Sequence, residues 1–68
     1  MALKEEIKRQ RKQKKMTQTD LANLLGVNLS TVLRWEKGRF MPKLGELSAM
    51  AKIFGVMEQD LITPQGVG

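Results

Sequence analysis

The chain has 68 residues, with 12 Lys and Arg against 7 Asp and Glu, and it contains neither Cys nor His. This length predicts one small domain. The absence of Cys and His excludes disulfides, Cys/His zinc sites and His-based catalytic pairs. The excess of basic residues favours a polyanionic partner. No apolar run approaches the roughly 20 residues of a membrane span and no signal-peptide pattern opens the chain, so we expect a soluble, cytoplasmic protein without a membrane partner.

The first predicted helix runs from about Leu3 to Lys14 and carries a dense run of cations. Its two glutamates fall in the first turn and its cations in the last, as the helix macrodipole favours. Leu3 and Ile7 are expected to face the core, together with the stem of Gln10 or Arg11. The cations form either a solvated helix face or a field that attracts phosphates.

The second predicted helix begins at Thr17, where Thr17-Gln18-Thr19-Asp20 resembles a capping box with Asp in place of Glu. Gln18 in its first turn can bond a phosphate oxygen or a base edge, or it is an ordinary surface residue. Gly26 supplies the positive φ of a tight turn, and Ala22 places a small side chain where two steeply crossed helices touch. Thus a helix-turn-helix arrangement is predicted.

The third predicted helix starts after Asn28 as its N-cap and ends at Gly38. Val32 and Trp35 share one face, and this spacing turns Trp35 into the core. The opposite face carries Leu29, Ser30, Leu33, Arg34 and Lys37.

Packing in the core does not explain which residues occupy the outward face of this third helix. Contact with thymine methyl groups would account for Leu29 and Leu33, although a protein-binding patch or scattered surface residues are alternatives. Arg34 is the best candidate for a bidentate contact to guanine, with a phosphate contact as its nearest rival.

The remaining elements complete one domain over residues 1–62. Pro42 prevents helix formation until about Leu44, and a fourth helix then runs to about Phe54 and is closed by Gly55. A short fifth helix covers about residues 58–62, and residues 63–68 are predicted to be a flexible C-terminal tail. The apolar positions of the fourth helix are Leu44, Leu47, Met50, Ala51 and Phe54.

The combination of these motifs resembles the Cro/cI-type, or Xre-like, helix-turn-helix family. The resemblance implies an all-α, compact five-helix lambda-repressor-like domain with the helix-turn-helix at helices 2 and 3, and it covers about residues 3–62. The matching elements are Ile7-x3-Arg11, TQTDLANLLGV, Val32-x2-Trp35-Glu36-x-Gly38, Pro42-x-Leu44-x2-Leu47, Ala51, Gly55-Val56 and Leu61.

The resemblance also implies roles for particular residues. It places base contacts at Gln18, Leu29, Ser30, Leu33 and Arg34. It places DNA backbone contacts at Thr17, Asn28, Lys37, Arg39 and Lys43. It further implies a partly buried ion pair between Arg11 and Glu36, and a homodimer on two-fold related half-sites.

Some positions depart from the family pattern. Gln10 stands where a core Leu is common, and Lys15 stands where Gly is common, so that turn is expected to be strained or differently shaped. Leu29 replaces a polar residue, which leaves the operator sequence open. The possible dimer surface is Val56, Met57, Leu61 and Ile62, of which Val56, Leu61 and Ile62 could equally well cap the core.

The resulting hypothesis is a sequence-specific regulator of transcription that binds double-stranded DNA. We expect a repressor that binds a palindromic operator as a dimer with its third helix in the major groove, and we expect no enzyme activity, cofactor or metal. One alternative is a protein-interaction or antitoxin-like module with the same fold. Another is a nonspecific nucleic-acid binder, for which preference across sequences would be flat and the salt dependence steep.

Overall fold

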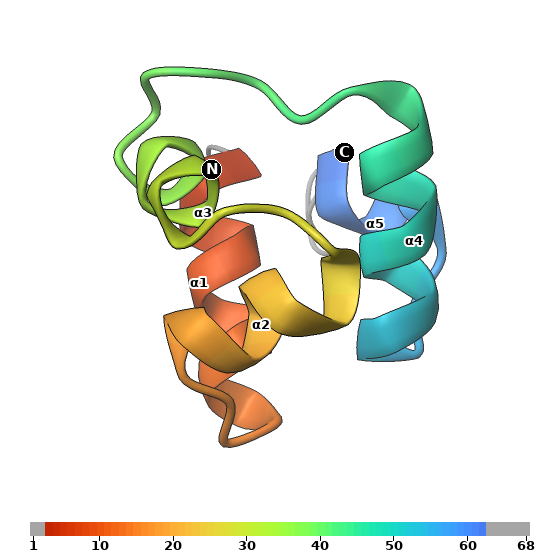
Figure 1. Ribbon diagram of the computed structural model, residues 1–68. Helices are drawn as coiled ribbons and strands as arrows, with labels where there is room; N and C mark the ends of the chain where they lie inside the picture. The colour runs from red at the N-terminus through yellow and green to blue at the C-terminus, as the bar shows by residue number, and fades with distance from the viewer. Residues whose placement is uncertain (1–2, 63–68) are drawn as a thin grey trace.

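The computed structural model describes residues 3–62, and this part of the chain folds into five α-helices without a β-strand (Figure 1). The predicted all-α class with five helices is therefore confirmed, whereas the predicted tail lies outside the described residues. None of the described helices is long and apolar enough to cross a membrane. The helices are α1 (Leu3–Gln13), α2 (Gln18–Leu25), α3 (Leu29–Glu36), α4 (Leu44–Phe54) and α5 (Glu58–Ile62).

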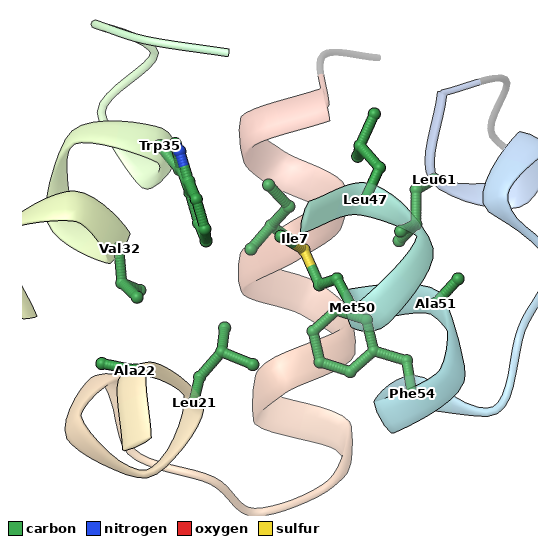
Figure 2. Close-up of a cluster of buried hydrophobic side chains, with 10 residues drawn as sticks. All are labelled: Ile7, Leu21, Ala22, Val32, Trp35, Leu47, Met50, Ala51, Phe54 and Leu61. Atoms are coloured by element: carbon green, nitrogen blue, oxygen red, sulfur yellow. The ribbon is translucent and has the colours of Figure 1, made fainter. Parts of the chain in front are cut away.

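Helix α1 lies between α3 on one side and α4 on the other, and Ile7 occupies the centre of the core (Figure 2). The core is formed where α1 meets α3 and α5, where α2 meets α3 and α4, and where α4 meets α5. Trp35 is 2 % exposed, as its helical spacing predicted. The buried apolar residues are Ile7, Leu21, Ala22, Val32, Trp35, Leu47, Met50, Ala51, Phe54 and Leu61.

Leu44, the first of the apolar positions of α4, is not part of the core, because its side chain is 73 % exposed. Leu44 is the first residue of α4, and helical side chains lean towards the N-terminus of their helix. Its side chain therefore projects beyond the end of the stripe, whereas Leu47, one turn later, is buried.

A polar cluster that the sequence pattern did not predict lies on α1, where Glu6 and Gln10 are buried and Arg9 is exposed. Glu6 is only 1 % exposed, although its place in the first turn suggested nothing beyond a favourable dipole interaction. The Arg9 Nε donates to Glu6 Oε1 at 3.1 Å, and the Gln10 Nε2 donates to Glu6 Oε2 at 3.0 Å. The hydrogen bond from Arg9 lowers the pKa of Glu6. Gln10 thus has a polar partner at a position where the family often places Leu.

Helices α2 and α3 end at glycines that adopt a left-handed backbone conformation. Gly26 after α2 has φ 71°, and the N–H of Val27 donates to the Ala22 carbonyl at 3.0 Å. Gly38, two residues after the end of α3 at Glu36, has φ 76°, and the N–H of Arg39 donates to the Arg34 carbonyl at 2.9 Å. A left-handed residue here satisfies carbonyls that would otherwise lack a partner.

Lys15, two residues after the end of α1, has φ 57°, a conformation that is unfavourable for a residue with a Cβ atom. The N–H of Met16 donates to the Arg11 carbonyl at 3.1 Å, so the turn has the same hydrogen bond as the glycine turns. The turn expected to be strained or differently shaped therefore keeps the shape of a glycine turn, and the strain lies in the left-handed backbone of Lys15.

Replacing Lys15 by glycine is expected to raise the free energy of unfolding by about 0.5–1 kcal/mol. The substitution removes the strain of a left-handed lysine from the folded state. Part of this stabilisation is offset because glycine gives the unfolded chain more conformational entropy. Urea denaturation followed by circular dichroism measures the change. The matched control is Lys14→Gly, which lacks a positive φ to relieve and should destabilise the domain. A Lys15→Gly protein no more stable than the wild type would contradict the expectation.

Candidate nucleic-acid interface

The helix-turn-helix consists of α2, the turn at Gly26 and α3, whose two faces have different environments. Val32 and Trp35 are buried against the core, at 0 % and 2 % exposed. Leu29 is 42 % exposed, and Ser30, Arg34 and Lys37 are also exposed, whereas Leu33 is half-buried. The buried residues anchor α3, and the exposed ones are available to a partner.

Five of the residues expected to contact DNA meet at one surface hollow. The lining combines the outer face of α3 with the start of the α3–α4 loop, and its charged side chains are all cationic. The lining residues are Ser30, Leu33, Arg34, Lys37 and Arg39. A basic, open surface with hydroxyl and apolar groups can bind phosphates and contact base edges.

Sequence reasoning did not single out Phe40, which lines a neighbouring hollow and contacts Arg34. The Arg34 Cζ lies 5.5 Å from the centroid of the Phe40 ring, within the range of a cation–π contact. Phe40 belongs to the α3–α4 loop, where helical periodicity gives no information on side-chain direction. An aromatic residue shortly after a glycine turn was the only signal in the sequence.

The N-cap residue of α3 does not cap the helix with its side chain. Asn28 has the extended backbone of an N-cap, with φ −72° and ψ 149°, but its side chain makes no capping hydrogen bond. The first N–H groups of the helix are therefore not satisfied by this side chain, and they carry the positive end of the helix dipole. Such an end favours a phosphate.

The predicted capping box of α2 is present. The N–H of Asp20 donates to Thr17 Oγ1 at 3.0 Å, and the N–H of Thr17 donates to Asp20 Oδ2 at 2.9 Å. The bond from the Thr17 backbone lowers the pKa of Asp20. The N–H groups of Gln18 and Thr19 take no part in the box, so they can face an anion at this helix end.

Arg11 and Glu36 form an ion pair between α1 and α3. The Arg11 Nε donates to Glu36 Oε2 at 2.7 Å, and the Nη2 donates to Glu36 Oε1 at 3.2 Å. A third bond runs from the Arg11 Nη1 to the Met16 carbonyl at 2.8 Å. The side chains are 9 % and 4 % exposed, so water screens this pair weakly.

The half-buried side chain of Gln18 also makes a contact within the protein. The Gln18 Nε2 donates to Glu36 Oε1 at 3.1 Å, so its amide extends the ion pair to the start of α2. This bond uses one of the two amide N–H donors, so the second N–H and the side-chain carbonyl remain available to a base edge or a phosphate. Its backbone N–H remains at the helix end.

Five expected contact residues do not line the hollow: Thr17, Gln18, Asn28, Leu29 and Lys43. Of these, Lys43 is the N-cap of α4, and its N–H donates to Glu46 Oε1 at 2.8 Å. Its side chain is exposed.

The expected dimer surface requires one correction. Leu61 is 0 % exposed and belongs to the core, because α5 packs this residue against α1 and α4. Met57 and Ile62 are 63 % and 52 % exposed, and Val56 is half-buried. A surface built from these residues therefore excludes Leu61.

No group of three or more Asp and Glu side chains within residues 3–62 could hold a metal ion. The groups gathered on the outer face of α3 are instead basic, hydroxyl and apolar. This chemistry suits recognition of an anionic surface.

Comparison with known proteins places this arrangement among DNA-binding domains. Residues 7–61 match the model of the family described as Helix-turn-helix. The uncharacterized HTH-type transcriptional regulator MJ0272 of Methanocaldococcus jannaschii is 39% identical over 59 residues, which cover 87% of this chain and 89% of that protein.

Two solved structures share the fold. The P22 c2 repressor in complex with a synthetic operator matches with a TM-score of 0.87 and 25% identity, over 93% of this chain and 96% of that one. Hydroxypropylphosphonic acid epoxidase from S. wedmorenis matches with a TM-score of 0.82 and 35% identity. That match covers 94% of this chain but 34% of the epoxidase, so the likeness concerns a domain-sized part of that enzyme and transfers no activity.

Proposed function

Because the chain belongs to the Cro/cI-type helix-turn-helix family of transcriptional regulators, we propose that it binds a specific sequence of double-stranded DNA. In this proposal α3 enters the major groove and the protein acts as a repressor without enzymatic activity. The P22 c2 repressor, whose fold this chain shares, was crystallised on operator DNA. Binding to chromosomal or phage DNA would place the protein in the cytoplasm.

The basic hollow on the outer face of α3 carries the proposal. It joins Ser30 and Leu33 of the helix to three cations, on the face opposite the buried Val32 and Trp35. A helix anchored on one side and basic on the other can be inserted into the major groove without disturbing the core.

Each residue of the interface has a distinct proposed role. Arg34 would bind guanine, Leu29 and Leu33 would contact thymine methyl groups, and Ser30 and Gln18 would bond base edges. Backbone contacts would fix the orientation of α3 without reading sequence. We assign these to Thr17, Asn28, Lys37, Arg39, Lys43 and the N–H of Gln18.

We further propose a homodimer on a palindromic operator. One domain of this size makes few base contacts, so two copies on one duplex would supply useful affinity. Val56, Met57 and Ile62 remain the proposed contact surface, with Leu61 withdrawn because it is buried.

The direct test is selection from a random duplex pool near physiological salt, followed by sequencing. We expect enrichment of an inverted repeat whose half-sites lie about 10 base pairs apart, centre to centre. Salt-sensitive binding without enrichment would identify a nonspecific binder instead. An absence of binding would contradict the DNA proposal as a whole.

Two variants separate base contacts from phosphate contacts. Arg34→Ala is expected to relax preference at one base pair by a factor of about 5 to 150, which corresponds to about 1–3 kcal/mol. Lys37→Ala should instead weaken binding to all duplexes alike and reduce the salt slope by about 1. Titrations on matched and mismatched duplexes measure both effects. Equal losses on every duplex from both variants would contradict base contacts by α3.

Exposed apolar residues favour a protein-interaction module as the second candidate. Met41 and Leu44 are 71 % and 73 % exposed at the end of the α3–α4 loop and the start of α4. If these residues contacted a protein partner, Met41→Ser and Leu44→Ser would abolish that complex while leaving DNA selection unchanged.

A further inference from the structure

The contact between Arg34 and Phe40 joins the third helix to the loop that follows it. The chain reverses after α3 because Gly38 is left-handed and the N–H of Arg39 donates to the Arg34 carbonyl at 2.9 Å. This turn brings the ring of Phe40 to 5.5 Å from the Arg34 guanidinium carbon. Local backbone geometry therefore creates the contact.

Arg34 is held in a different way from the two arginines of α1. Arg9 is bonded to the Glu6 carboxylate, and Arg11 is bonded to the Glu36 carboxylate. Within residues 3–62, the contact that holds the Arg34 guanidinium is the aromatic ring, and no carboxylate pairs with it.

This difference matters for recognition of a base. A guanidinium bound to a carboxylate must break hydrogen bonds before it can donate to guanine. An aromatic ring attracts the cation through its quadrupole and occupies no hydrogen-bond acceptor. The ring can therefore restrict the long Arg34 side chain while leaving its donors available, which lowers the ordering cost of binding.

We propose that Phe40 is a positioning residue that holds Arg34 ready to bind one guanine, so that a loop residue outside α3 determines sequence preference. The inference rests on the proposed function, because it concerns how Arg34 recognises DNA. It accounts for an aromatic side chain that is 58 % exposed and contacts Arg34.

The contact is first tested in the free protein by nuclear magnetic resonance. The ring current of Phe40 should shift the Arg34 Cδ proton resonances upfield, and Phe40→Leu should abolish this shift while preserving apolar bulk. Unchanged Arg34 resonances in Phe40→Leu would overturn the contact. This readout does not depend on DNA.

The functional test uses the selected operator and a duplex altered at the base pair whose preference Arg34→Ala relaxes. Phe40→Ala and Phe40→Leu should each reduce the affinity ratio of these duplexes by about two- to fivefold, the range of an exposed cation–π contact. Phe40→Trp should retain the ratio, because indole binds cations well. Met41→Ala is the matched control and should leave the ratio unchanged, since Met41 is an exposed neighbour in the same loop.

The effect must also depend on Arg34. In an Arg34→Ala background, Phe40→Ala should change the ratio no further, and thermal melts should show that all variants are folded. An unchanged ratio in Phe40→Ala, an equal loss on both duplexes, or a further loss without Arg34 would overturn the inference. Wild-type enrichment of an operator would still support the proposed function in those cases. A wild-type protein without base preference would overturn both.

Discussion

Replacing Arg11 by alanine is expected to reduce the free energy of unfolding by about 3–5 kcal/mol. The substitution leaves the Glu36 carboxylate 4 % exposed without its cation and removes the donor to the Met16 carbonyl. Small domains are stable by only about 5–15 kcal/mol, so the variant should lose much of its stability. Urea denaturation followed by circular dichroism measures the loss.

A double-mutant cycle assigns this loss to the ion pair. Glu36→Gln should destabilise the wild type more than it destabilises Arg11→Ala, because the second background already lacks the pair. Arg39→Ala is the matched control, since Arg39 is exposed and its replacement should change stability by no more than about 0.5 kcal/mol. If Arg11→Ala melted like the wild type, the pair would not contribute to stability.

Replacing Leu61 by alanine is expected to cost about 2–5 kcal/mol. Leu61 is 0 % exposed and is the buried residue of the five-residue helix α5. The lost packing and the resulting cavity would both weaken the attachment of α5 to α1 and α4. Thermal and urea denaturation measure the effect.

The neighbouring residue supplies the control for this substitution. Ile62 is 52 % exposed, so Ile62→Ala should change monomer stability by no more than about 0.5 kcal/mol. If Ile62 belongs to the proposed dimer surface, sedimentation with operator DNA should show weaker assembly of this variant. A stable Leu61→Ala protein would contradict the assignment of Leu61 to the core.

The helices could be predicted from the sequence because their signals were local. Thr17 and Asp20 carry both halves of a capping box, Gly26 permits the left-handed turn, and Trp35 follows Val32 at helical spacing. Such signals depend on a few adjacent residues. They therefore predicted element order and most of the core without knowledge of the packing.

Residues whose environment depends on distant parts of the chain could not be placed in the same way. Glu6 is buried by tertiary packing, although a glutamate in a first turn is usually solvated. Gln18 bonds Glu36, which is 18 residues away in sequence. Phe40 reaches Arg34 only through the turn after α3, and no periodic pattern indicates its direction.

The two-sided construction of α3 bears on how this protein could diverge. Val32 and Trp35 hold the helix in the core, while Leu29, Ser30 and Arg34 contribute to its exposed face. Substitutions at exposed positions usually alter stability by no more than about 0.5 kcal/mol. After gene duplication, copies of this protein could therefore change what they bind through a few substitutions on the exposed face of α3, while its buried residues stay the same.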